Sequence, residues 1–473
     1  MWAGPRHTYG LAVFAALWAF SPLGSVAPLR AQVAPPVNVA EVDSIVRATM
    51  ESSGIVGLSV GVMQNGKVVL AKGYGMASLE TKTPVTALTM FPIGSVTKQF
   101  TCSVALLLGE DKKLSMHDPV SKYFPSLTRA TEITLLDLGQ HVSGYRDFYP
   151  LDFVDREMQH DVSAEAIMHE YATRPLDFAP GTRWSYSNTN FTILGAAAEK
   201  ASGQSLGQLM SRRIFVPLGM KHTSFDPPTD GSPRATGYSS WTLADPTPAQ
   251  PEAKGWTGAA GAIWSTPTDL LAWDLALVTG KVLSPASYAT LTTARRLKDG
   301  RSTGYGCGEG VNDQGAAITL SHGGAVSGSV TQNTVLPASR SAVVLLANTE
   351  TGLGGLTNAI VSRLLPQSNV PKIAGLPALD AIKAYLGQLA AGHVDRSTLS
   401  DDFNAHLTPE RERAAAASLS KLGAISDIRV VRTVERGGME VAVLRLMVGQ
   451  VAASGTMYRT PDGKIQQVLI ERQ

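Results

Sequence analysis

The chain has 473 residues, of which 44% are hydrophobic and 17% charged, and its 41 basic and 39 acidic residues give a formal net charge of +2. This balance excludes a polybasic nucleic-acid-binding protein and an acidic disordered chain. The 2 cysteines exclude a disulfide-framed scaffold and a thiolate zinc cluster, and the 9 histidines include no His-Glu-x-x-His pair for a metal ion. We therefore expect a soluble, globular enzyme of two or three domains that uses no cofactor or metal.

Residues 1–31 have the order of a secretory signal peptide. Arg6 and His7 form a short positive start, residues 11–20 are an uninterrupted apolar run, and Ala31 is a small residue at the expected cleavage point. A membrane anchor is the alternative, but a spanning helix needs ~20 apolar residues, and this run is too short. We therefore expect a secreted or periplasmic protein without a membrane span, cleaved after about Ala31.

Residues 32–365 are predicted to form one α+β domain. A helical run of apolar residues from Val39 to Met50 ends at Gly54, and Asn65-Gly66 joins two strand-like stretches as a hairpin. Helical patterns then dominate, and three more strand-like stretches follow near the end of the domain. The five stretches lie at 55–63, 67–72, 319–322, 328–336 and 342–347. Strands at both ends of a helical region predict one antiparallel sheet that the two ends close together.

The composition changes after Leu365. Residues 366–377 contain three prolines and no periodicity, and are interpreted as a linker. Residues 378–473 are predicted to form a small, separate α+β domain, with an amphipathic helix near its start and a second helix from Thr408-Pro409. Its strand-like runs lie at 425–435, 439–448, 451–459 and 464–470. This order resembles the cone-shaped nuclear-transport-factor-two-like fold.

Two serine motifs compete for the role of nucleophile. Residues 57–61 match G-x-S-x-G, in which Ser59 would be exposed on a sharp turn between a strand and a helix. Here the residues after Gly61 continue as a strand and turn into another strand at Asn65-Gly66. The context that this motif requires is missing, so Ser59 is predicted to be an ordinary strand residue.

The second motif is Ser95-x-x-Lys98 at the start of a predicted helix, after chain-breaking Pro92 and Gly94. A spacing of three places both side chains on one face, with their Cβ atoms about 5–6 Å apart. Burial would lower the pKa of the lysine and allow it to act as a base, and the helix N-terminus would stabilise a serine alkoxide. A surface serine with a solvated lysine is the alternative that this short motif leaves open.

Two further motifs supply chemistry that such a serine would need. Tyr186 and Asn188 alternate in an extended segment, so their side chains are expected on the same side. The tyrosine could carry protons for the serine, and the asparagine could bind a substrate amide or Lys98. His322 and Gly324 end a strand-like run, where glycine permits close approach of the main chain to an acyl substrate. Taken singly, the tyrosine would be a packed aromatic residue and the histidine a loop residue.

In this order and spacing, the three motifs resemble those of the serine β-lactamase and penicillin-binding superfamily, most closely its class C-type branch of β-lactamases, D-aminopeptidases and esterases. The resemblance covers residues 39–364. It includes three more segments typical of the branch, 138–144 (LGQHVSG), 217–220 (PLGM) and 260–270 (AGAIWSTPTDL). It implies the β-lactamase/transpeptidase-like fold, in which an antiparallel sheet is flanked by helices and an all-helical lobe.

The resemblance also implies a role for each motif residue. Ser95 would be the nucleophile, and Lys98 and Tyr186 would share its activation. The expected substrate-binding residues are Asn188, His322, Gly324 and Ala325. The backbone N–H groups of Ser95 and Ala325 would form an oxyanion hole.

His322 departs from the pattern of the family's β-lactamases. They carry the lysine of K-T-G at this position, and its fixed charge holds the substrate carboxylate. A histidine with a pKa near ~6.5 is mostly neutral at neutral pH and binds carboxylates weakly. Esterases and aminopeptidases of the family carry such a histidine more often. The residue therefore argues against an efficient β-lactamase and leaves slow turnover of reactive β-lactams open.

The two cysteines are expected to be structural. Cys102 falls four residues after Lys98 on the predicted helix and should face the core behind the site. Cys307 lies near the closing strands. The sequence leaves open whether the two form a disulfide bond, because that depends on their separation in space.

These residues together predict an exported serine hydrolase that cleaves ester or amide bonds through an acyl-enzyme on Ser95. Its expected partner is a small-molecule substrate, namely an ester, an amide or a peptide. Nucleic acid is not expected to bind, and the oligomeric state is left open. A D-amino-acid peptidase or a weak β-lactamase is the alternative activity. Alternatives of another class are a penicillin-binding sensor that is acylated without turnover, and an inactive scaffold whose function lies in the C-terminal domain.

Overall fold

The computed structural model describes residues 34–472 except 150, 152, 241, 243, 314–316 and 366–370. The predicted signal peptide and the first part of the predicted linker lie outside the described residues. Within them, no helix has the length and apolar character needed to cross a membrane.

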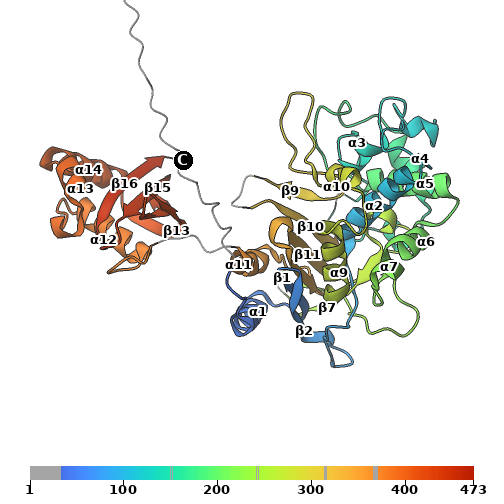
Figure 1. Ribbon diagram of the computed structural model, residues 1–473, viewed down its shortest axis with the longest axis horizontal. Coiled ribbons are helices and arrows are strands. Elements are labelled where there is room, and N and C mark those ends of the chain that lie inside the picture. Colours follow the sequence, from blue (N-terminus) through green and yellow to red (C-terminus); the bar gives the residue numbers. More distant parts are fainter. Residues whose placement is uncertain are drawn as a thin grey trace, which may run out of the picture. The chain divides into compact units, whose positions relative to one another are not determined.

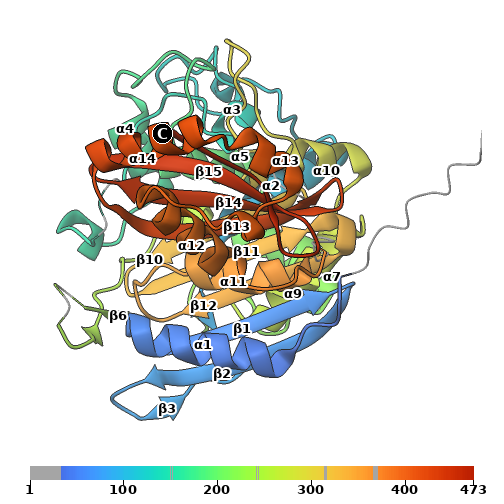
Figure 2. The ribbon, with the colours of Figure 1, turned by 90° about the vertical axis from the view of Figure 1, so that its left-hand side faces the viewer.

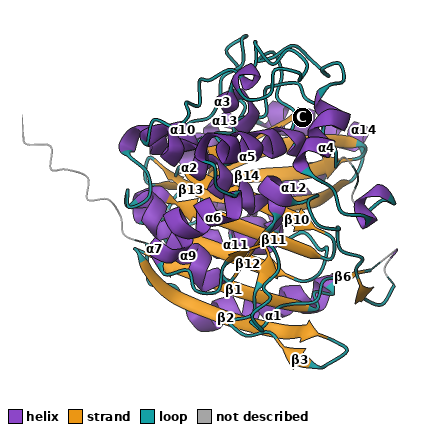
Figure 3. Ribbon diagram, turned by 90° about the vertical axis from the view of Figure 1, so that its right-hand side faces the viewer, coloured by secondary structure: helices purple, strands orange, loops and turns teal. Residues whose placement is uncertain are grey.

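A seven-stranded antiparallel sheet is the framework of residues 34–365, with the strand order β3-β2-β1-β12-β11-β10-β9. Figure 3 shows its strands from β3 to β10 in this order. Its strands are β1 (Gly57–Gln64), β2 (Lys67–Ser78), β3 (Thr83–Pro84), β9 (Gly310–Asn312), β10 (Thr319–Val326), β11 (Ser329–Leu336) and β12 (Ser341–Ala347). β1 pairs with β12, with Leu58 opposite Ala347, and β1 joins β2 in a hairpin at Asn65-Gly66. The prediction that the two ends of the domain close one antiparallel sheet is therefore confirmed.

Helices cover both faces of this sheet, because its central strands are apolar on both sides. In β12, Val343 and Leu345 face one core, whereas Val344 between them faces the other. The covering helices are α1 (Val39–Ser53) and α11 (Gly354–Leu364) on the first face, and α2 (Thr97–Glu110) and α9 (Pro267–Val278) on the second. Figure 2 shows α1 lying along β1 and β2.

The second face also carries the predicted all-helical lobe (Figure 1). Its helices are α3 (Leu135–Gly139), α4 (Ala164–Ala172), α5 (Asn188–Ser202), α6 (Leu206–Met210), α7 (Val216–Leu218), α8 (Gly258–Gly261) and α10 (Pro285–Thr292). Helix α2 runs between this lobe and the sheet, and every residue from Thr97 to Leu108 is buried. The structure buries this helix all round, which fixes its N-terminus inside the protein.

Short strands fix the position of the segment that precedes α2 in the chain. β4 (Phe91–Pro92) pairs with β8 (Ile263–Ser265), and β8 also pairs with β5 (Ser224–Phe225). The N–H of Ile93 donates to the carbonyl of Ile263 over 2.8 Å. This small sheet brings α8 and the segment after it beside the turn that leads into α2. The Pro- and Gly-rich stretch 226–253 contributes the short pair β6 (Tyr238–Ser239) and β7 (Thr247–Pro248).

The competing serine, Ser59, lies in the middle of β1. It is fully buried between Leu58 and Val60, which are buried as well. A strand leads directly into the β1–β2 hairpin, so the strand–turn–helix corner of a nucleophile elbow is absent from this described segment. The prediction that Ser59 is an ordinary strand residue is confirmed.

Cys102 and Cys307 form a disulfide bond, with their Cα atoms 5.8 Å apart. Cys102 lies in α2 and is fully buried, as the sequence predicted. The bond ties α2 to the segment before β9, 205 residues further along the chain. That distance in sequence is why the residues alone left the pairing open.

Removing this disulfide is expected to lower the free energy of unfolding of the protein by about 2–4 kcal/mol, because the unfolded chain gains freedom when a long loop is no longer closed. The change to test is the double replacement Cys102→Ala with Cys307→Ala, followed by urea denaturation. The wild-type protein should be destabilised by dithiothreitol to the same extent, and the double variant should not respond to it. Equal stability of the two proteins under oxidising conditions would contradict this expectation.

The C-terminal elements form their own sheet and core. The helices are α12 (Ala378–Ala390), α13 (Asp401–His406) and α14 (Pro409–Leu422), and the strands are β13 (Ile425–Arg436), β14 (Met439–Val448), β15 (Val451–Arg459) and β16 (Ile465–Arg472). The strands pair antiparallel in chain order. Ile382 and Leu386 of α12 share one apolar cluster with Leu444 and Met457 of the sheet. The predicted helices and strands of this region are confirmed.

Candidate active site

Ser95 lies on a tight turn that leads into α2. Residues Gly94–Val96 form a single 3-10 turn, η1, and α2 follows at Thr97. Gly94 has a φ angle of +51°, and a Cβ atom there would lie 2.8 Å from the backbone nitrogen of Ala325. Glycine therefore allows this turn to approach β10 closely. The serine stands at a helix start as predicted, with a 3-10 turn in front of the α-helix.

Lys98 is fully buried next to Ser95 and has three hydrogen-bond partners. Its Nζ atom lies 2.9 Å from Ser95 Oγ, 2.8 Å from Asn188 Oδ1 and 2.9 Å from the carbonyl oxygen of Ala260. The same atom lies 4.8 Å from the centre of the Tyr186 ring. These contacts exclude a solvated lysine.

Burial lowers the pKa of Lys98 to about 7, and the negative charge of Asp147 opposes part of this shift. The amine is therefore neutral in much of the protein at slightly alkaline pH. A neutral amine has two hydrogens and one lone pair. The oxygens of Asn188 and Ala260 can only accept hydrogen bonds, so they take the two hydrogens, and the lone pair faces the hydroxyl of Ser95. This arrangement is suited to removing the serine proton.

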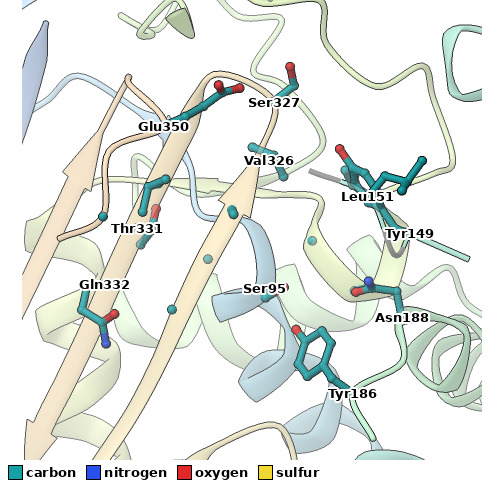
Figure 4. Close-up of a pocket in the computed structure, with 18 of the residues that line it drawn as sticks. Ser95, Tyr149, Leu151, Tyr186, Asn188, Val326, Ser327, Thr331, Gln332 and Glu350 are labelled. Carbon is teal, nitrogen blue, oxygen red and sulfur yellow. The ribbon is translucent and has the colours of Figure 1, made fainter. Parts of the chain in front are cut away.

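Tyr186 lies beside Ser95 and Asn188 at the same wall of the cleft (Figure 4). Burial raises the pKa of Tyr186, and a hydrogen bond with Ser95 opposes this only in part. The phenol ring packs against His141, with ring centroids 4.3 Å apart, and His141 Nδ1 accepts from the backbone N–H of Ser187 over 3.1 Å. The tyrosine is thus held as a neutral hydroxyl, which can accept one hydrogen bond and donate another next to the serine.

His322 was predicted to bind substrate, and that role stays a prediction. The residue is buried behind Tyr186 and is not among the described residues that line the cleft. Its Nδ1 lies 2.6 Å from the carbonyl of Gly323, which can only accept, so Nε2 accepts from the hydroxyl of Tyr305 over 2.7 Å. Burial lowers the pKa of His322 to about 3, so the ring is neutral. Both ring nitrogens are occupied inside the protein.

The edge of β10 forms the wall opposite Tyr186. Among the described strands, β9 is the one that pairs with this edge, and it pairs only with Thr319–Ser321. The following residues, Gly323–Ser327, line the cleft. A Cβ atom at Gly324 would collide with the carbonyl of Ile93 and lie 3.1 Å from the nitrogen of Ser95. The N–H of Ser95 is near the start of η1, where such groups have no partner within the helix. Gly324 and Ala325 thus lie against the backbone of the serine turn.

The cleft has a volume of about 820 Å³. Figure 4 shows Ser95, Tyr186 and Asn188 along one side, and Thr331 and Gln332 on the sheet at the other. Among the described residues that line it, none is lysine or arginine. A substrate carboxylate would therefore find no lysine or arginine charge at the described walls of the cleft.

Sequence reasoning missed two groups of this site. Asp147 Oδ1 accepts from the backbone N–H of Asn188 over 2.8 Å and lies 3.2 Å from Asn188 Nδ2. The residues are 41 positions apart, and no motif links them. The second group is the carbonyl of Ala260, a main-chain acceptor that no side-chain pattern can reveal. Among the described residues, no group of three or more His, Cys, Asp or Glu side chains is placed to hold a metal ion.

The sequence model of the Beta-lactamase family matches residues 42–364, a range that contains every site residue named above. This chain belongs to the beta-lactamase family. It is 32% identical over 325 residues to a D-aminopeptidase of Brucella anthropi, which covers 67% of this chain and 61% of that protein. A second D-aminopeptidase, from Brucella canis, is 29% identical over 342 residues, or 71% of this chain and 64% of that protein. The chain therefore spans less than two thirds of the length of these curated relatives.

Solved structures show the fold of this beta-lactamase-family chain. A class C beta-lactamase superposes with a TM-score of 0.58 at 23% identity, over 68% of this chain and 95% of that chain. The octameric penicillin-binding protein homologue from Pyrococcus abyssi has a TM-score of 0.60 at 20% identity, over 92% of this chain and 100% of that chain. The predicted β-lactamase/transpeptidase-like fold is confirmed.

Proposed function

We propose that this beta-lactamase-family protein is an exported serine hydrolase that cleaves amide bonds of D-amino acid peptides or amides, and also esters, through an acyl-enzyme on Ser95. The observation that carries the proposal is the amine of Lys98, which is buried, has a pKa of about 7 and is hydrogen-bonded to Ser95. The similarity to D-aminopeptidases supports the choice of substrate. The disulfide bond supports export, because such bonds persist in oxidising compartments.

Acylation follows from the contacts around Ser95. The hydroxyl proton passes to Lys98 while Oγ attacks the substrate carbonyl carbon, and the negative charge that forms on the carbonyl oxygen is stabilised by the N–H groups of Ser95 and Ala325. The proton then passes, by way of the Tyr186 hydroxyl, to the leaving amine as its bond to carbon breaks. The open edge of β10 would align a peptide substrate as an additional strand.

Deacylation reverses the proton path. A water molecule attacks the ester carbon of the acyl-enzyme and gives its proton to Lys98. The bond to Ser95 Oγ breaks, the acid leaves, and the proton returns from Lys98 to the serine oxygen. Asn188 Nδ2 lies 3.2 Å from Oδ1 and 3.4 Å from Oδ2 of Asp147, and one of its two N–H groups would bind a substrate carbonyl.

The proposal is tested by steady-state and burst kinetics with four substrates: the p-nitroanilides of D-alanine and L-alanine, a p-nitrophenyl ester and a chromogenic cephalosporin. We expect turnover of the D-anilide roughly tenfold or more faster than of the L-anilide, a burst followed by turnover with the ester, and slow turnover of the cephalosporin. A stoichiometric burst with the cephalosporin and no turnover of any substrate would support a penicillin-binding sensor instead. No reaction with any of the four would contradict a serine mechanism.

A further inference from the structure

The loop between α3 and α4 places an acidic side chain against the asparagine of the site. Asp147 is partly buried, and its Oδ1 accepts from three donors: the backbone N–H of Asn188 (2.8 Å), Asn188 Nδ2 (3.2 Å) and the backbone N–H of Tyr149 (3.2 Å). Two of the three donors belong to Asn188, at the first turn of α5. Asp147 therefore contacts both the main chain and the side chain of the residue that binds Lys98.

This contact decides which way the amide of Asn188 faces. An asparagine side chain carries an acceptor and a donor of nearly the same shape, and its orientation depends on its partners. The carboxylate of Asp147 can only accept, so the nitrogen of Asn188 faces Asp147 and the oxygen faces Lys98 Nζ, 2.8 Å away. In the opposite orientation, the oxygen of Asn188 would face the carboxylate of Asp147, and two acceptors would meet there.

The orientation of this amide in turn determines where the lysine lone pair points. With Asn188 Oδ1 and the Ala260 carbonyl as acceptors, the neutral amine of Lys98 presents its lone pair to Ser95. With a donor at Asn188, the lone pair would be drawn to that donor and away from the serine. Asp147 itself contacts neither Ser95 nor Lys98 through any described hydrogen bond.

We propose that Asp147 is a positioning residue, which locks the amide of Asn188 with its oxygen toward Lys98 and so aims the lysine lone pair at Ser95. This inference rests on the proposed function, because it assigns the same base to the same nucleophile. It adds Asp147, which affects the reaction through the side chain of Asn188.

The charge of Asp147 has a separate effect, which can be measured by itself. The other titratable groups that face Lys98 are Tyr186, His141 and His322, and the pKa shifts of all three leave them neutral near neutral pH. The negative charge of Asp147 raises the pKa of Lys98. Loss of the charge is therefore expected to move the acidic limb of kcat/KM below about pH 7.

Two replacements separate the hydrogen bond from the charge. Asp147→Asn keeps an Oδ1 acceptor for the same three donors and removes the charge, so the plateau of kcat should stay within about threefold of wild type while the acidic limb moves to lower pH. Asp147→Ala removes both, so kcat should fall roughly 10-fold to 100-fold. Asp177→Asn is the control, because Asp177 is an exposed carboxylate that pairs with Arg146, next to Asp147 in sequence; it should leave both quantities unchanged.

A double-mutant cycle with Asn188→Ala shows whether Asp147 acts through the asparagine. If it does, Asp147→Ala in the Asn188→Ala background should cause no further loss of kcat, because the amide it orients is gone. Additive losses of kcat would overturn the proposal and leave a purely structural residue, whereas an unmoved acidic limb in Asp147→Asn would contradict the separate effect of the charge. Failure of the proposed function would look different: the wild-type protein would then show no burst with the p-nitrophenyl ester, and both ideas would fall together.

Discussion

Replacing Ser95 by alanine is expected to reduce kcat by at least about 10⁴-fold for every substrate of the enzyme, because no acyl-enzyme can form without the serine oxygen. The protein should remain folded. The neutral amine of Lys98 still has Asn188 and Ala260 as acceptors for its two hydrogens, so the buried lysine keeps two of its three partners in Ser95→Ala. Steady-state kinetics and thermal melting of the purified variant measure the two effects.

Ser59→Ala is the matched control for this experiment. Ser59 belongs to the competing G-x-S-x-G motif, is fully buried, and has a hydroxyl without a hydrogen-bond partner in the described structure. Its replacement should leave kcat unchanged and should not lower the melting temperature, since an unsatisfied buried hydroxyl contributes nothing to stability. A Ser95→Ala variant with full activity, or a Ser59→Ala variant without activity, would contradict the assignment.

The second large effect is expected at Lys98. In the wild-type enzyme, kcat/KM should rise with pH through about 7, because the protonated amine has no lone pair for the serine proton and the neutral amine has one. Lys98→Arg keeps a permanent positive charge and removes the base, so it should lower kcat by about 10²–10⁴-fold and abolish the acidic limb. A pH–rate profile from about pH 5 to about pH 9 measures both.

Lys122→Met is the control for Lys98. Lys122 is a half-exposed lysine paired with Asp118 on the surface, so its loss should change neither kcat nor the pH profile. The account of Lys98 would be wrong if the wild-type profile were flat across neutral pH, or if Lys98→Arg kept wild-type activity.

The fold could be predicted where the sequence pattern and the packing agree. Asn65-Gly66 lies between two apolar runs, and the hairpin forms there because both residues adopt the turn conformation that its twist requires. The continuous apolar run 342–347 is a central strand because helices cover both faces of the sheet. The short strand pair in the stretch 226–253 could not be predicted in this way, because it is defined by contacts with distant loops.

The site could be predicted in part, for reasons that its residues make clear. Ser95, Lys98, Tyr186 and Asn188 meet because two local motifs hold them at the turn into α2 and at the segment that leads into α5. The position of His322 on β10 was predicted, but its contacts depend on Tyr305, a partner that no motif marks.

The contacts of Asp147 and the Cys102–Cys307 bond could not be predicted from the sequence, and the reason is the same for both. Each joins segments that are far apart along the chain, and the pairing is fixed by the packing of the lobe on the sheet. A carboxylate between a loop and a helix start, or a cysteine in a buried helix, has no spacing rule of its own. Only the folded chain brings these groups to their partners.

The central claim is that Ser95 is the nucleophile that becomes acylated. The direct measurement is to treat the wild-type protein with a fluorophosphonate, which bonds to an activated serine oxygen and releases fluoride, and then to identify the labelled peptide by mass spectrometry. The account predicts one label per chain, on Ser95, formed faster as the pH rises through about 7 and absent from Ser95→Ala. A label on another serine, or no label on a protein that still hydrolyses its substrates, would contradict it.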